Sequence, residues 1–107
     1  ALLQINGADV PFVIDTGASA LVLTQQDARR AGLDPQTLAF SQIAQTANGE
    51  VKTAPVRLDS VRFGHFTDRD VRAHVNGGAM ETSLLGMSYL RLFDQITITQ
   101  SRLVLTR

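Results

Sequence analysis

The stretch Asp15-Thr16-Gly17 has the clearest potential for chemistry in this sequence. Asp15 follows the apolar residues 12–14, so its carboxylate stands at the end of an apolar strand. Burial of such a charge is costly unless it is hydrogen-bonded or paired. The Thr16 hydroxyl is able to donate a hydrogen bond that fixes the turn, and Gly17 lets backbone approach both the carboxylate and a substrate. The three residues suggest a chemical reason for a carboxylate at this position.

A structural role for Asp15 is the alternative. An Asp at a turn often accepts hydrogen bonds from nearby backbone N–H groups and does nothing else. At average residue usage the bare tripeptide occurs by chance in roughly one chain of this length in fifty. The residues around it must therefore decide between the two interpretations.

The elements that position this turn are expected to be mostly strands. Thr24 and Asp27 predict the start of a helix over residues 25–31, and residues 89–93 show near-helical spacing. The pattern predicts a mainly β single domain over residues 1–107 with one or two short helices. Short apolar or alternating segments bounded by turn residues predict strands at 3–5, 10–14, 20–23, 43–46, 51–58, 61–63, 71–75, 96–98 and 103–105.

Composition limits the partners and the chemistry. Ten basic and ten acidic residues are scattered without a basic run, so neither nucleic acid nor anionic lipid has an electrostatic footprint. The absence of cysteine excludes disulfides and thiolate zinc sites. His65 and His74 lack the spacing of a helical zinc pair and are expected on solvent-facing strand positions. No metal is expected.

The chain resembles the retropepsin-like aspartic proteases, in which each of two subunits supplies one Asp-Thr-Gly loop. Three parts in this order carry the resemblance: Asp15-Thr16-Gly17-Ala18-Ser19 after an apolar strand, a hairpin with Asn48-Gly49 at its tip, and Leu84-Leu85-Gly86 before a short helical segment. The resemblance implies a closed β-barrel of the acid-protease fold. It also implies that Leu84, Leu85 and Gly86 give structural support behind the loop.

The implied mechanism needs two carboxylates. An isolated Asp, with a pKa near 3.9, is ionised at neutral pH and is a poor acid, whereas two adjacent carboxylates share one proton. The ionised member takes a proton from water and the protonated member gives one to the substrate carbonyl. Since the chain has a single Asp-Thr-Gly, we expect a homodimer in which Asp15 faces Asp15 of the partner subunit. The expected function is an aspartic endopeptidase for extended polypeptide segments, without a cofactor.

The Asn48-Gly49 hairpin is expected to act as a flap over the bound peptide. Asn-Gly is the strongest short hairpin signal, and an ordinary surface hairpin would be the default interpretation without the Asp15 motif. With that motif, Thr46, Ala47, Asn48 and Gly49 are placed to contact the peptide backbone.

Two features near the motif depart from relatives. Many two-domain relatives carry a hydroxyl residue where this chain has Ala18, and a hydroxyl there would favour the ionised carboxylates. Its absence predicts activity nearer mildly acidic to neutral pH. Viral members commonly have a salt-bridged acid and Arg where this chain has Ser19 and Met87. Both charges are replaced together, so the fold is not threatened, while subsite specificity and dimer contacts are expected to differ.

Two other functions remain open on the residues alone. One is a catalytically silent peptide-binding or dimerisation module on the same fold. The other is a hydrolase using Ser88 and a histidine, which is weak because Gly86-Met87-Ser88-Tyr89-Leu90 lacks the closing glycine of a nucleophile elbow.

The resemblance is nearest to bacterial, membrane-anchored members, through Thr46-Ala47-Asn48-Gly49 and Ser83-Leu84-Leu85-Gly86-Met87-Ser88. No apolar run approaches the roughly 20 residues that span a bilayer. The sequence begins without Met, as a trimmed fragment would. A periplasmic location is therefore expected, with an inner-membrane anchor in an N-terminal segment absent from this chain.

Overall fold

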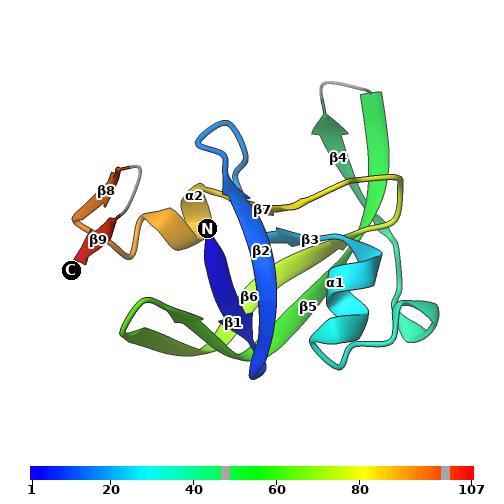
Figure 1. The fold of residues 1–107 in the computed structure, drawn as a ribbon. Helices are drawn as coiled ribbons and strands as arrows, with labels where there is room; N and C mark the ends of the chain where they lie inside the picture. Colours follow the sequence, from blue (N-terminus) through cyan, green and yellow to red (C-terminus); the bar gives the residue numbers. More distant parts are fainter. Residues whose placement is uncertain (47–48, 100–101) are drawn as a thin grey trace.

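Six strands close into a barrel in the computed structural model, which describes residues 1–46, 49–99 and 102–107 (Figure 1). Their order is β1-β2-β7-β3-β6-β5, and pairing of β1 with β5 completes the circle. The strands are β1 (Leu2–Ile5), β2 (Ala8–Ile14), β3 (Val22–Leu23), β5 (Gly49–Phe63), β6 (Phe66–Asn76) and β7 (Ser83–Leu85). The mainly β fold with a closed barrel is as predicted.

The centre of the barrel brings together strands that are far apart in sequence. β2 pairs in parallel with β7, with Phe12 opposite Ser83 and Ile14 opposite Leu85. β3 then lies between β7 and β6. The connection from β2 to β3, which contains Asp15, therefore starts and ends beside β7.

Two short α-helices and one 3-10 turn accompany the strands. The helix α1 (Gln25–Arg30) begins as predicted, because the Thr24 Oγ1 atom accepts a hydrogen bond from the Asp27 N–H at 3.0 Å. It ends one residue before the predicted position. The 3-10 turn covers Pro35–Thr37, and the helix α2 (Met87–Leu90) follows β7 directly.

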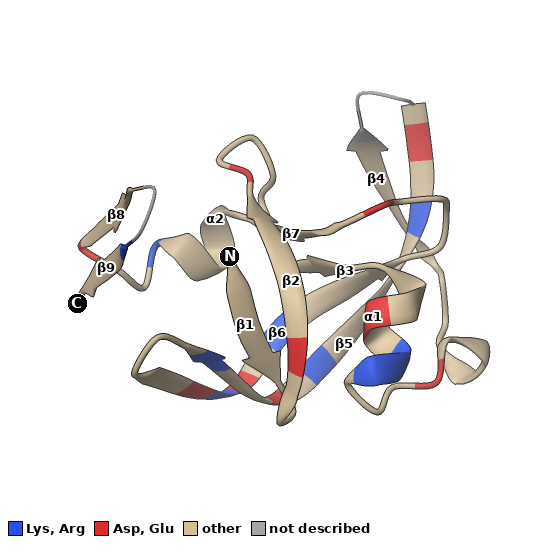
Figure 2. Cartoon of the chain, in the orientation of Figure 1, with Lys and Arg blue, Asp and Glu red and all other residues tan. Residues whose placement is uncertain are grey.

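The barrel interior is apolar. Along β2, Val10 and Phe12 are buried while Pro11 and Val13 are exposed, which is the alternation expected of a strand with one face in the core. Side chains that are almost fully buried include Leu3, Ile5, Leu21, Leu23, Leu58, Val61, Phe63, Val75, Leu85 and Tyr89. Acidic and basic residues are interspersed along α1, β5 and β6 (Figure 2).

The predicted separate strand at residues 61–63 is wrong, because β5 runs unbroken for 15 residues. Asp59 and Ser60 lie between the predicted strands at 51–58 and 61–63. The structure shows instead that the Asn6 Oδ1 atom, in the β1–β2 turn, accepts hydrogen bonds from the N–H groups of both residues at 2.8 and 3.2 Å. A distant side chain therefore satisfies the backbone there, and the strand continues.

The histidines also differ from expectation. His65 lies in the exposed turn between β5 and β6 rather than on a strand. His74 lies on β6 but is only half-exposed, since the loop that precedes β3 approaches it and the Leu21 carbonyl accepts its backbone N–H at 2.9 Å.

The C-terminal strands form a separate hairpin beside the barrel (Figure 1), made of β8 (Gln95–Ile98) and β9 (Leu103–Thr106). Arg107 joins it to β6 by an ion pair with the Asp68 carboxylate. The Arg107 guanidinium also lies 4.5 Å from the centre of the Phe93 ring. On this hairpin Ile98, Leu103 and Val104 are exposed apolar residues.

Tyr89 also contacts Asp68, the carboxylate that pairs with Arg107. Its hydroxyl donates to the Asp68 Oδ2 atom at 3.3 Å. Burial, and then the negative charge of Asp68, raise the pKa of the Tyr89 hydroxyl above its usual range. Within the described residues, no helix has both the length and the apolar character needed to cross a bilayer.

Candidate active site

Asp15 lies in a tight turn at the end of β2. The Gly17 N–H donates to the Asp15 Oδ1 atom at 2.9 Å, and the Ala18 N–H donates to the Asp15 carbonyl at 3.1 Å. A Cβ atom on Gly17 would lie 3.2 Å from Oδ1, so a larger residue would crowd the carboxylate. Asp15 is half-buried, while Thr16 and Gly17 are exposed. The turn holds the carboxylate by one oxygen and presents it at the surface.

Thr16 does not fix this turn in the way expected. Among the described residues its hydroxyl has no hydrogen-bond partner, and its side chain faces solvent. The backbone N–H groups of Gly17 and Ala18 do this work instead.

The segment from Leu85 to Ser88, at the end of β7 and the start of α2, is hydrogen-bonded to the Asp15 turn. The Asp15 N–H donates to the Leu85 carbonyl at 3.0 Å. On the far side of the turn, the Met87 N–H donates to the Ala18 carbonyl and the Ser88 N–H to the Ser19 carbonyl, both at 2.9 Å. Backbone bonds to one segment therefore hold the turn at its entrance and its exit.

Gly86 sits where the two segments cross. A Cβ atom there would lie 2.1 Å from the Ala20 carbonyl oxygen and 2.7 Å from the Ala20 nitrogen, which is far below van der Waals contact. Its neighbour Leu85 is fully buried and Leu84 is half-buried. In this structure Leu85 contacts the turn through its backbone carbonyl, and Leu84 pairs with Val13 of β2 and Val22 of β3.

A buried polar network behind β7 was not foreseen from the sequence. The Ser83 hydroxyl donates to the Asp27 Oδ2 atom at 2.6 Å and accepts from the Thr24 N–H at 3.1 Å. Ser83 is fully buried and Asp27 is 6% exposed. The available signal was a serine opening an apolar strand and an acid within an amphipathic helix. The network ties α1 to β7, the strand that ends at Leu85 just before Gly86.

The β4–β5 hairpin extends from the barrel on the same side as the Asp15 turn (Figure 1). Its strand β4 (Gln42–Thr46) pairs with β5 in a register that runs from Gln42 opposite Thr53 to Thr46 opposite Gly49. The predicted hairpin is present. The predicted peptide contacts Ala47 and Asn48 lie outside the described residues.

Other chemistries find no assembled site in the described part of the chain. It contains no cluster of three or more His, Cys, Asp or Glu side chains that could hold a metal ion. Ser88 is exposed on α2, and no hydrogen bond links its side chain to either histidine in the described ranges. What the geometry offers is one carboxylate, that of Asp15, on a turn held by backbone hydrogen bonds.

The chain is similar to several known proteins. The family model described as "gag-polyprotein putative aspartyl protease" matches residues 1–92. The crystal structure of a retropepsin-like aspartic protease from Rickettsia conorii is 38% identical, with a TM-score of 0.81 over 97% of this chain and 85% of that chain.

Two further similarities extend this picture. An uncharacterized protein of a Sinorhizobium species is 39% identical over 92% of this chain but 43% of its own length, so the chain spans less than half of that relative. The EIAV protease, solved with the inhibitor HBY-793, shares the fold at 20% identity and a TM-score of 0.71, over 85% of this chain and 83% of the other.

Proposed function

The chain belongs to the retropepsin-like aspartic protease family, and from that premise we propose that it is one subunit of a homodimeric aspartic endopeptidase. Asp15 of each subunit supplies one carboxylate of the catalytic pair. The observation that carries the proposal is the presented Asp15 carboxylate, which accepts a hydrogen bond from the Gly17 N–H, while the Asp15 backbone N–H donates to the Leu85 carbonyl.

A second copy supplies what a single chain lacks. The Asp15 turn projects at the surface, and its exposed residues Thr16 and Gly17 leave the carboxylate accessible to an identical turn. In a twofold dimer each surface meets its own copy, so two such turns come together across the axis. The exposed apolar residues Ile98, Leu103 and Val104 of the C-terminal hairpin provide further apolar area for a partner.

The paired carboxylates then divide the work. Repulsion between two negative charges at close range keeps one proton on the pair. The ionised carboxylate removes a proton from a water molecule as that water attacks the peptide carbonyl carbon, and the protonated carboxylate gives its proton to the carbonyl oxygen. The Gly17 hydrogen bond keeps each carboxylate oriented throughout.

The substrate is an extended polypeptide segment held between the pair and the β4–β5 hairpin, which acts as a flap. Ile43 on β4 is 65% exposed, and a large apolar side chain in that position suits contact with a substrate or partner. Thr46, Ala47, Asn48 and Gly49 are the proposed contacts to the substrate backbone.

The test is cleavage of a mixed peptide library between about pH 3 and pH 8 by the natural chain and by Asp15→Asn. Cleavage that disappears in the variant supports the proposal and reports the subsite preferences. Equal cleavage by both proteins rejects it. If neither cleaves while sedimentation shows a dimer, the silent peptide-binding module becomes the better description.

We also propose a periplasmic location, with an inner-membrane anchor in a segment outside this chain. The greater length of the matched relatives leaves room for such a segment. Fractionation of the full-length protein into periplasmic, membrane and cytoplasmic pools tests this, and recovery from the cytoplasmic pool alone would contradict it.

A further inference from the structure

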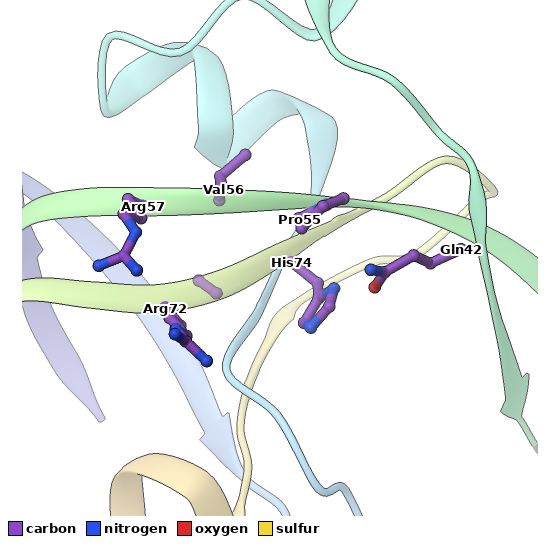
Figure 3. A pocket seen from close by; sticks show the side chains of 7 residues that line it. Gln42, Pro55, Val56, Arg57, Arg72 and His74 are labelled. Carbon is purple, nitrogen blue, oxygen red and sulfur yellow. The ribbon is translucent and has the colours of Figure 1, made fainter.

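An open groove lies on β5 and β6, and its lining contains no residue of the Asp15 turn (Figure 3). Its volume is about 540 Å³, and its lining includes Gln42, Pro55, Arg57, Arg72 and His74. In Figure 3, Arg57, Arg72 and His74 extend from the two strands toward the same side, and Gln42 extends from β4 toward His74. No lining residue belongs to the turn or to the proposed flap contacts.

Two arginines face each other across the strands of this groove. Arg57 and Arg72 are direct partners in the antiparallel register of β5 and β6. Like charges in directly opposite positions destabilise a sheet, because their Cβ atoms are only about 4.5–5.5 Å apart. A negative group between the two guanidiniums would remove that repulsion.

The chain itself supplies only part of this negative charge. The Arg57 guanidinium pairs with the Asp70 carboxylate at 2.8 Å, and both side chains are more than half exposed. Arg72 has no ion-pair partner among the described residues. The Asp70 carboxylate therefore pairs with only one of the two guanidiniums, and the Arg72 charge is left without a counter-charge among the described residues.

Asp70 holds its position at a conformational cost. Its φ of 55° lies in the left-handed region, which is unusual for a residue other than glycine within a strand. Such strain tends to persist where the surrounding structure requires it. Here it places a carboxylate on Arg57 and orients that guanidinium at the edge of the groove.

His74 adds an unsatisfied polar atom to the same face. It lies two residues after Arg72, so both side chains project from the same side of β6. Its Nδ1 atom is buried and has no hydrogen-bond partner within the described ranges. A buried polar atom without a partner costs free energy, and native structures seldom keep one without a reason.

We propose that this groove binds a phosphate group, either free or as a monoester, through Arg57, Arg72 and His74. One oxyanion between the guanidiniums of Arg57 and Arg72 would offset their repulsion, with the His74 ring beside it on the same face of β6. Guanidinium groups bind phosphate through two parallel hydrogen bonds. The arginines, His74 and the Gln42 amide offer more donors than the two oxygens of a carboxylate accept, whereas a phosphate has three or four oxygens.

The direct test is a titration of the isotope-labelled chain with inorganic phosphate, followed by NMR at constant ionic strength against sodium chloride. We expect saturable shifts at the His74 ring and the Arg72 side chain. Arg72→Gln should weaken phosphate binding by about tenfold or more, because it replaces a charged hydrogen-bond donor with a neutral one on a long polar side chain. Arg69→Gln is the matched control, since Arg69 is exposed on the same strand opposite Ser60 and outside the groove.

Thermal unfolding gives a second measurement. A ligand that binds only the folded state raises the midpoint temperature with its concentration. Phosphate should therefore stabilise the natural chain and Arg69→Gln more than chloride does, and this advantage should vanish in Arg72→Gln. NMR shifts that never saturate with phosphate, or that chloride reproduces, would overturn the proposal. So would an Arg69→Gln variant that weakens phosphate binding as much as Arg72→Gln does.

A parallel titration with O-phosphoserine separates the two sources of phosphate. Tighter binding than inorganic phosphate would indicate a monoester ligand, and equal or weaker binding would indicate the free ion. Neither measurement depends on peptide cleavage, so failure of this proposal and failure of the proposed protease activity are distinguishable.

Discussion

The α-carbon of Gly86 lies so close to the Ala20 backbone that a methyl group on it would sit 2.1 Å from the Ala20 carbonyl oxygen. Backbone cannot yield as a flexible side chain can. Gly86→Ala is therefore expected to lower the free energy of unfolding by about 2 kcal/mol or more and to displace the Asp15 turn. Urea unfolding measures the first effect and peptide cleavage the second.

Gly78→Ala is the control for that substitution. Gly78 is exposed, and a Cβ atom there would meet the Asn76 Oδ1 atom at 3.3 Å, a contact that a small shift relieves. We expect a change below about 1 kcal/mol. Similar losses in both variants would show that the crossing at Gly86 has no special role.

Loss of one Asp15 should inactivate a whole dimer. In a heterodimer of natural and Asp15→Asn subunits, a single carboxylate cannot both remove and supply a proton. Cleavage should fall by about a thousandfold or more relative to the natural homodimer. Co-expression with two different affinity tags yields the mixed dimer. Retention of about half the activity would mean that each Asp15 works alone.

The Ser83–Asp27 hydrogen bond is predicted to stabilise the strand behind the site. Ser83→Ala leaves the buried Asp27 carboxylate and the Thr24 N–H without this partner. The free energy of unfolding should fall by about 1–3 kcal/mol. The double variant with Asp27→Ala should cost less than the sum of the two single changes. If the losses in the free energy of unfolding simply add, the two side chains act separately. Ser88→Ala, at an exposed serine, is the control and should change the free energy of unfolding little.

Tyr89 predicts a loss of stability at alkaline pH. The folded state raises the pKa of its hydroxyl, through burial and the nearby Asp68 charge, while the unfolded chain keeps a value near 10. Above that pH the unfolded state releases a proton that the folded state retains, so the free energy of unfolding falls as pH rises. Below about pH 10 the stabilising contribution of the Tyr89 hydroxyl is fully present.

The sequence makes this effect measurable at one residue, since Tyr89 is the only tyrosine. Phenolate absorbance should therefore appear only at higher pH than in the unfolded chain. Tyr89→Phe should remove its share of the alkaline decline in urea unfolding experiments. Titration of the folded chain near pH 10 would contradict the prediction.

The residue after the motif should set the acidic limit of cleavage. Ala18 contributes no hydroxyl to the carboxylates, so the pH optimum should lie well above about 3. Ala18→Ser adds a donor that favours the ionised form, and the acidic limb of the pH–rate profile should move to lower pH. An unchanged profile would show that the hydroxyl does not reach the pair.

Local signals predicted the local parts of this fold. The hairpin and the Thr24 cap each depend on residues a few positions apart, and both are present, although Gly49 already pairs with Thr46 as the first residue of β5. The closure of the barrel by β1 and β5, and the parallel pairing of β2 with β7, depend on contacts across the whole chain. The Asn6 side chain shows why such contacts escape prediction, because it completes β5 from more than fifty residues away.

The candidate site likewise contains some features that the sequence predicted and others that it did not. Asp15 and Gly17 form the turn that their types predicted, and the Leu84-Leu85-Gly86 segment lies behind it. The Ser83–Asp27 bond and the unpaired Nδ1 atom of His74 had no counterpart in the sequence pattern, since both depend on which neighbours the closed barrel provides.

The bonds from the Asp15 turn to Leu85, Met87 and Ser88 also determine when the site first exists. The backbone groups that hold the Asp15 turn are synthesised about seventy residues after Asp15 itself. A nascent chain that ends before Leu85 therefore has the motif without its geometry. Contacts of such long range form late, after loop closure. Synthesis itself thus delays the geometry of the Asp15 turn until the segment from Leu85 to Ser88 has been made.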